Sequence, residues 1–80
     1  MPYYAGRAIK ELRLKLNLSQ DDMAYKINEK FGTSVNKGMI SKWENGLGDP
    51  RLETIRHISI LFNVSSDYLL GLSTNNTPKL

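Results

Sequence analysis

The sequence lacks cysteine and has a single histidine, His57, among its 80 residues. Without thiols it forms no disulfides and no thiolate metal site, and one imidazole cannot build a multi-histidine metal site. No apolar run approaches the roughly 20 residues of a membrane-spanning helix, and no signal segment opens the chain. We therefore expect a cytoplasmic protein that uses no cofactor, no metal ion and no membrane.

Groups able to act as a catalytic pair are also scarce. One histidine, no cysteine and no glycine-rich phosphate loop leave no nucleophile beside a general base. Asp21 and Asp22 are adjacent acids, but they follow Ser19 at the start of a predicted helix, where acids favour the positive end of the helix dipole. We expect that the protein is not an enzyme.

The positive charge is small and unevenly distributed. Eleven Lys and Arg against eight Asp and Glu give a net charge of +3. Residues 1–46 contain eight basic and five acidic side chains, whereas residues 47–80 contain three of each. The whole excess lies in the first half, which suits a polyanionic partner there. Three surplus charges would equally serve solubility, so charge by itself leaves both interpretations open.

Helical spacing of the apolar residues dominates the sequence, and strand signals are weak. Turn residues divide the chain into five helical segments, at about 5–16, 20–31, 37–45, 50–62 and 66–70. The side chains expected to face the core are Ile9, Leu12, Leu16, Met23, Ala24, Ile27, Phe31, Ile40, Trp43, Leu52, Ile55, Ile58 and Leu61 or Phe62, and the short fifth segment carries Tyr68, Leu69 and Leu70. The prediction is an all-α, compact five-helix domain over residues 1–72 with a flexible polar tail at 73–80.

Capping residues support these boundaries. Ser19 is a good N-cap with Asp22 three residues on, Asn36 precedes the third segment, and Asp49-Pro50 offers a cap and a first-turn proline for the fourth. Ser65 or Ser66 is expected to cap the fifth. Residues that favour helix ends follow the segments, namely Asn17, Gly32, Gly46 and Gly71.

The middle of the chain has the organisation of a helix-turn-helix. Two predicted helices, 20–31 and 37–45, are joined by a short glycine-containing turn at 32–36. The second helix confines its apolar residues mainly to Ile40 and Trp43, which we assign to the core rather than to base stacking. Its other face presents side chains that are small or donate hydrogen bonds, as contacts to phosphates and base edges require. We predict that this helix lies in the DNA major groove.

Four motifs follow one another in the chain: LSQ at 18–20, ISKWENG at 40–46, PRLETI at 50–55 and NVSSDYLLG at 63–71. In this order they resemble the Cro and lambda-repressor family, the helix-turn-helix group of phage repressors and bacterial regulators, over about residues 6–72. The resemblance implies a sequence-specific transcriptional regulator of phage or bacterial origin, a repressor that binds a two-fold site on double-stranded DNA as a homodimer. We expect dimer contacts from the fifth helix and residues 61–72.

The resemblance also implies which residues contact bases. Lys37 and Gly38 match the two leading positions of the recognition helix, and Lys42 matches a third position one turn later. Met39 and Ser41 flank them and are expected at a thymine methyl or a phosphate. Gly38 stands where a base-contacting side chain is common, so direct base contacts are expected mainly from the two lysines.

Further positions match contacts to the DNA backbone. Gln20 matches a phosphate ligand near a helix N-terminus, Asn45 matches a phosphate contact just after the recognition helix, and Arg51 matches a residue that leans into the minor groove. We add Asn36, at the start of the recognition helix, to this DNA-binding set. Arg13 and Glu44 match a structural ion pair between the first and third helices. The other lysines are interpreted as surface charges, namely Lys10, Lys15, Lys26 and Lys30.

The sequence departs from the resembled pattern in its central turn. Gln20 and Trp43 are separated by about six residues more than in the compact domains of this kind. We place the extra residues at 28–34, as one more helical turn and a longer loop.

Two alternatives to a DNA-binding repressor stay open: an antitoxin or anti-regulator module that uses this fold to bind a protein, and the N-terminal part of a longer repressor.

Overall fold

A computed structural model describes residues 5–71 of the chain. The described part contains five helices and no strand: α1 (Ala5–Lys15), α2 (Gln20–Phe31), α3 (Lys37–Glu44), α4 (Leu52–Phe62) and α5 (Ser66–Leu69). The all-α, five-helix prediction is therefore confirmed. The predicted tail at 73–80 and the proposed boundary at 72 lie outside the described residues. None of the described helices is long and apolar enough to cross a membrane.

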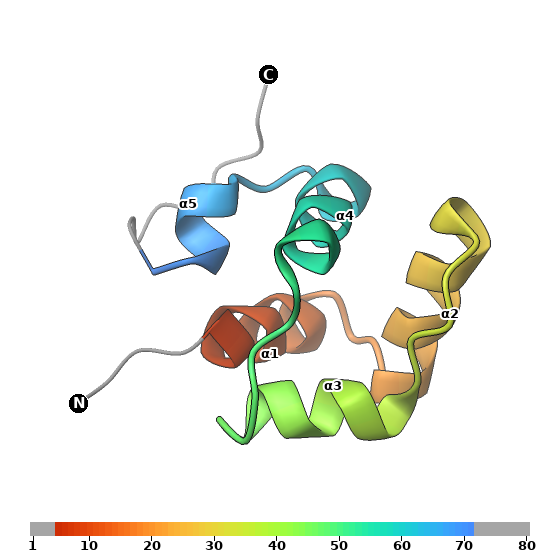
Figure 1. Cartoon of the computed structure of the whole chain (residues 1–80), viewed down its shortest axis with the longest axis horizontal. Helices are drawn as coiled ribbons and strands as arrows, with labels where there is room; N and C mark the ends of the chain where they lie inside the picture. Colours follow the sequence, from red (N-terminus) through yellow and green to blue (C-terminus); the bar gives the residue numbers. More distant parts are fainter. Residues whose placement is uncertain (1–4, 72–80) are drawn as a thin grey trace.

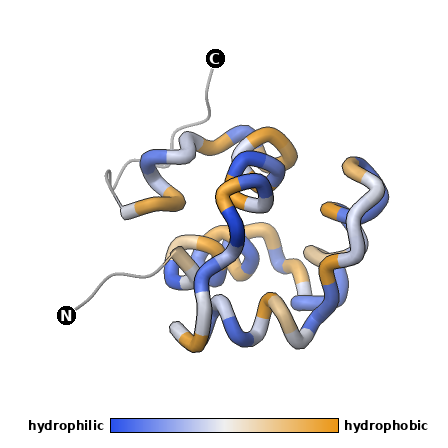
Figure 2. The backbone as a smooth tube through the Cα atoms, in the orientation of Figure 1, coloured by the Kyte–Doolittle hydropathy of each residue, from blue (hydrophilic) through white to orange (hydrophobic). Residues whose placement is uncertain are grey.

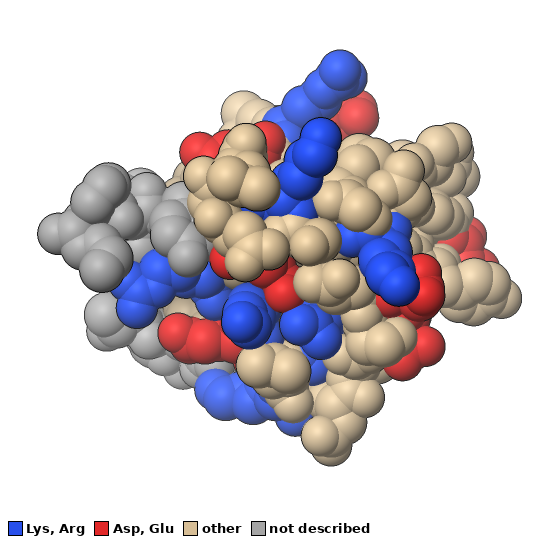
Figure 3. Space-filling view, turned by 90° about the horizontal axis from the view of Figure 1, so that it is seen from below, with Lys and Arg blue, Asp and Glu red and all other residues tan. Residues whose placement is uncertain are grey.

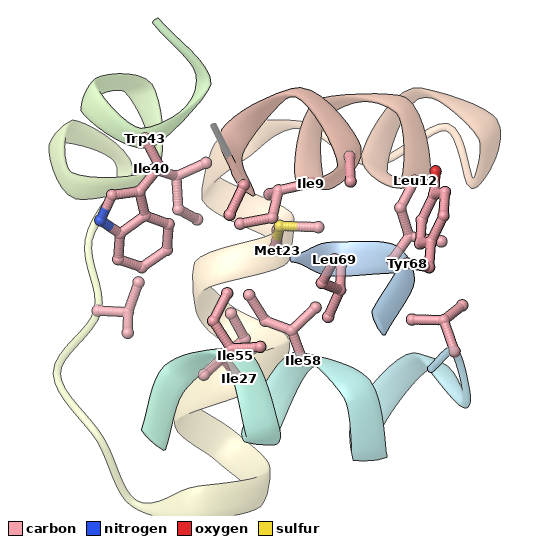
Figure 4. Packing of buried hydrophobic residues seen from close by; sticks show 14 of the residues in the cluster. Ile9, Leu12, Met23, Ile27, Ile40, Trp43, Ile55, Ile58, Tyr68 and Leu69 are labelled. Carbon is pink, nitrogen blue, oxygen red and sulfur yellow. The ribbon is translucent and has the colours of Figure 1, made fainter. Parts of the chain in front are cut away.

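The helices surround one apolar core (Figures 1 and 2). α1 packs against α3 and α5, and α2 packs against α3 and α4, so that α3 lies along one edge of the molecule. Figure 4 shows side chains from all five helices meeting in the interior. The side chains with essentially no exposure are Ile9, Met23, Ile27, Ile40, Ile55, Ile58 and Leu69.

The predicted caps of α2, α3 and α5 are confirmed. The Asp22 backbone N–H donates to Ser19 Oγ at 2.9 Å while Asp22 Oδ2 accepts from the Ser19 N–H at 3.0 Å, which completes a capping box. Ser65 caps α5 by accepting from the Tyr68 N–H at 3.0 Å. After the C-terminal ends of α1 and α2, the backbones of Asn17 and Gly32 are left-handed, with φ of 57° and 66°.

The start of α4 differs from the prediction. Pro50 is buried, and the chain stays extended through Arg51, with φ −64° and ψ 156°, so the helix begins at Leu52 instead of Pro50. Arg51 is the N-cap and makes no side-chain cap hydrogen bond. Leu52 is the first residue of the helix and is 64% exposed, so its assignment to the core was wrong.

One other apolar residue was wrongly placed on the inner face of its helix. α1 ends at Lys15, so Leu16 no longer continues that face and is 47% exposed. Phe31, Leu61 and Phe62 are only partly buried against the core.

Gly6 allows a close approach that the sequence did not indicate. It is buried in α1 where this helix crosses the end of α3. A Cβ atom at Gly6 would overlap the backbone carbonyl of Trp43. A side chain here would therefore force the two helices apart, and the absence of one sets the distance between α1 and α3.

Candidate nucleic-acid interface

α3 lies at the surface with one side facing the core and the other facing outward. Ile40 and Trp43 are buried, which confirms their assignment. The outward side, which we call the recognition face, consists of exposed Lys37, Gly38, Met39 and Lys42 and half-buried Ser41. The helix thus presents two lysines and small or flexible side chains to any partner that approaches this edge.

Lysine and arginine side chains gather on this edge of the molecule. Figure 3 views the molecule from the side of α3 and shows basic side chains across much of the visible face, with acidic ones among them and toward the margins. Lys37 begins α3 and Lys42 lies in its last turn. The distribution agrees with the excess of basic residues in the first half of the sequence.

A hydrogen-bonded network fixes α3 to the two helices before it. Arg13 Nε donates to Glu44 Oε2 at 2.7 Å, and Nη2 donates to Oε1 at 2.9 Å, which confirms the expected pair. The third donor is Gln20 Nε2, at 3.1 Å from Glu44 Oε1. Arg13 Nη1 also donates to the carbonyl of Leu18 at 2.9 Å. Hydrogen bonding to Glu44 raises the pKa of Arg13, so this guanidinium stays charged.

Gln20 occupies the place expected of a phosphate ligand. It is the first residue of α2, where backbone N–H groups without helical partners favour an anion. Its hydrogen bond to Glu44 fixes the direction of the carboxamide. The pattern of residues did not indicate this link, because Gln20 and Glu44 lie 24 positions apart in the sequence.

The two asparagines that flank α3 both bond to the helix itself. Asn36 Oδ1 accepts from the Met39 N–H at 2.9 Å and caps the helix. Asn45 follows the last residue of the helix, and its Nδ2 donates to the Ser41 carbonyl at 2.8 Å. The predicted helix range 37–45 therefore includes one residue too many, because Asn45 is the C-cap.

Met39 and Arg51 are brought together, although they are far apart in the sequence. Both line a shallow groove of about 390 Å³ that runs between the turn before α3, α3 itself and the start of α4. Val35, Trp43 and Pro50 also line it and give it apolar walls. The structure thus places Arg51 beside the recognition face, at the side nearer α4.

Asn28 organises the turn between α2 and α3, a role that no pattern in the sequence indicates. Its Nδ2 donates to the Val35 carbonyl at 2.7 Å, and its Oδ1 accepts from the Val35 N–H and from Thr33 Oγ1, both at 2.8 Å. Its backbone carbonyl accepts from the Gly32 N–H at 2.8 Å. One side chain therefore fixes the path of the turn up to the cap of α3.

The described residues contain no group of three or more His, Cys, Asp or Glu placed to hold a metal ion. His57 is instead stacked on Phe31, with ring centroids 3.9 Å apart and an interplanar angle of 8°. His57 is partly exposed, and the stack adds a contact between α2 and α4.

Comparison with known proteins gives one family and two relatives. The family model described as helix-turn-helix matches residues 9–69. The HTH-type transcriptional regulator ImmR of Bacillus subtilis (strain 168) is 36% identical over 66 residues, which cover 82% of this chain and 47% of the relative. The HTH-type transcriptional activator BcrR of Enterococcus faecalis is 37% identical over 63 residues, covering 79% of this chain and 28% of the relative. The chain thus spans less than half the length of either relative.

Proposed function

Because the chain belongs to the helix-turn-helix family, we propose that it is a sequence-specific DNA-binding transcriptional regulator whose α3 lies in the major groove. The observation that supports this most strongly is the division of α3 into a buried side and a recognition face with two lysines. Lys37 and Lys42 would donate to guanine O6 and N7, and Gly38 lets the backbone approach the bases. Binding to bacterial or phage DNA would place the protein in the cytoplasm.

Backbone contacts would fix the position of the protein on the duplex. Gln20 at the start of α2 and Asn36 and Asn45 at the two ends of α3 are proposed at phosphates, and Arg51 is proposed at the minor groove. These contacts contribute affinity for any sequence, whereas the recognition face chooses among sequences. The action is binding alone, without a catalytic step.

We propose repression by occlusion of a promoter. The basis is the resemblance to phage repressors, and a relative named as an activator shows that the opposite effect occurs among similar proteins. A reporter gene behind the bound site distinguishes the two. Expression should fall when the protein is present, and a rise would show activation instead.

A two-fold site requires two copies with their α3 helices roughly 34 Å apart. Tyr68 and Leu69 of α5 are buried in the core, so they are not free for the dimer contacts first expected of this helix. Leu70, directly after α5, is 40% exposed, and three more strongly exposed apolar side chains lie on α4 and in the loop before it: Leu52 at 64%, Ile60 at 55% and Leu47 at 75%. We propose that a second copy covers this surface on DNA.

Analytical ultracentrifugation with a selected duplex tests the dimer. Two chains should bind each duplex, and Leu52→Gln with Ile60→Gln should reduce this to one chain. Leu16→Gln is the matched control, because Leu16 is comparably exposed but lies at the end of α1. One chain per duplex for the unaltered protein would contradict a dimer.

Salt dependence separates DNA binding from the alternative, a module that uses this fold to bind only a protein. Affinity for a random-sequence duplex should fall linearly with salt on logarithmic axes, with a slope of about −0.9 per phosphate contact. Fluorescence anisotropy at several salt concentrations measures this slope. An absence of affinity for any duplex at low salt would favour the protein-binding alternative.

A further inference from the structure

A second hollow lies beside the end of α3, on the side of α1. It has a volume of about 330 Å³, and the residues around it come from α1 and from the last positions of α3: Arg7, Lys10, Glu11, Leu14, Glu44 and Asn45. Asn45 is one of the residues proposed at a backbone phosphate. The hollow therefore adjoins the proposed interface and extends it onto a helix that has had no part in binding so far.

Two basic side chains border this hollow without an acidic partner. Arg7 and Lys10 lie three residues apart on one face of α1, and both are exposed. Within residues 5–71 the ion pair that forms is Arg13 with Glu44, so no carboxylate lies within ion-pair distance of either Arg7 or Lys10. Both charges are available to an anion from outside.

The two acids in the lining are already engaged. Glu44 is buried and accepts hydrogen bonds from Arg13 and Gln20, which offsets its charge. Glu11 Oε1 accepts from the Tyr68 hydroxyl at 3.1 Å, which directs this carboxylate toward α5. The charge of Glu11 weakens the positive potential of the hollow but leaves an excess from Arg7 and Lys10.

Because the hollow lies beside α3, the anion that fits it best is a phosphate of the DNA duplex that α3 binds. α1 crosses the end of α3 so closely that Gly6 has no room for a side chain, and Arg7 is the next residue. Figure 3 shows basic side chains across the face seen from the side of α3. With α3 in the major groove, the DNA strand that borders the groove beside the end of α3 would bring its phosphates to the hollow.

We propose that Arg7 and Lys10 form a second phosphate-binding site, which holds the DNA backbone at the end of α3 opposite to Lys37. The site rests on the proposed function, and it deepens it by adding α1 to the interface. The ligand is a phosphodiester of the duplex, bound through charge and hydrogen bonds without regard to sequence. The lysine at position 10, first interpreted as a surface charge, acquires a role through its neighbours in space.

The test compares two charge-matched double variants on the same random-sequence duplex. Arg7→Gln with Lys10→Gln removes two positive charges from the hollow, and Lys26→Gln with Lys30→Gln removes two from α2. Each lost contact should reduce the magnitude of the salt slope by about 0.9 and, if the contact contributes nothing at 1 M salt, weaken binding about eightfold at 0.1 M. The α1 variant loses up to two contacts, so its salt slope and the logarithm of its affinity should each change by up to twice these amounts. The α2 variant should keep the wild-type slope.

A third variant tests the sign of the local charge. Glu11→Gln removes the negative charge but keeps an acceptor for Tyr68, so binding should become tighter by roughly 1.5- to 5-fold. Thermal unfolding of each variant verifies the fold. Equal slopes for the α1 and α2 variants, or binding by Glu11→Gln that is unchanged or weaker, would overturn the α1 site. Lack of binding by the unaltered protein would overturn the proposed function itself.

Discussion

Glu44 shows how a single residue holds the interface in place. Its side chain is only 3% exposed, yet its carboxylate accepts hydrogen bonds from α1 and α2 at once. A buried ion pair adds little net stability, because desolvation offsets most of the attraction, whereas removal of one partner leaves an uncompensated charge. The pair therefore positions α3 more than it stabilises the fold.

Arg13→Met should lower the free energy of unfolding by about 3–5 kcal/mol, because Glu44 would keep a buried charge with a single donor. Arg13→Met combined with Glu44→Leu should recover most of the loss, since neither charge is then buried. Urea denaturation of the two variants measures the difference. Equal destabilisation in the single and double variants would show that packing, and not the charge, is responsible.

Gly6→Ala should destabilise the fold by about 1–3 kcal/mol, because the added Cβ overlaps the Trp43 carbonyl and overpacks the crossing of α1 and α3. Gly38→Ala is the control: its Cβ would meet only Asn36 Oδ1, at 3.3 Å, and its effect should stay within about 0.5 kcal/mol. Thermal unfolding compares them. A stable Gly6→Ala variant would contradict the close crossing.

Residues whose role depends on near neighbours in the chain could be predicted from the sequence. Ser19 and Asn36 were identified as caps, and Ile40 and Trp43 as core, because these assignments need only spacing along one helix. The Arg13–Glu44 pair came from family resemblance. Gly6 went unnoticed, because its importance depends on which backbone crosses it, and no local pattern contains that information.

At the scale of elements, the turn between α2 and α3 decides how the recognition face is presented. This connection is the place where the sequence departs from the resembled family, and we expected one more helical turn and a longer loop at 28–34. α2 continues to Phe31, and residues 32–36 form the turn. A longer turn has more conformations to lose on folding. The side-chain hydrogen bonds of Asn28 limit that freedom.

Asn28→Ala should loosen the turn while leaving the other helices intact. The Val35 amide would lose its acceptor, so its hydrogen exchange should accelerate, and affinity for a selected duplex should fall by about tenfold, which corresponds to about 1.4 kcal/mol. Thr33→Val removes only one of the three hydrogen bonds and should have a smaller effect. Unchanged exchange at Val35 would show that the turn keeps its path without Asn28.

The elements themselves were predictable, but some of their limits were not. Apolar periodicity located all five helices, since each buries one side against the same core. The start of α4 was misplaced, because Asp49-Pro50 has the composition of a helix start whereas the chain stays extended through Arg51. Leu52 was assigned to the core from its three-residue spacing to Ile55, but as the first residue of α4 it is exposed. Tertiary packing decided these positions.

At the scale of the whole molecule, the fold assembles the proposed DNA-binding face from separate parts of the chain. The start of α2, the recognition face of α3 and Arg51 come from positions 20 to 51, and the basic residues of α1 extend this face on the other side of α3. The sequence revealed the excess of positive charge in the first half but not its direction in space. Which charges belong together follows only from the packing of α1 on α3.

The most direct test of the central claim is the specificity of the recognition face. Duplexes selected from a random pool by the unaltered protein are compared with random duplexes in a gel-shift assay, for Lys37→Ala, Lys42→Ala and, as a control on α2, Lys26→Ala. Each α3 variant should lose about 1–3 kcal/mol of affinity for the selected duplex and discriminate less, whereas the control should not. If both α3 variants keep wild-type affinity and base preference, α3 is not the helix that recognises DNA.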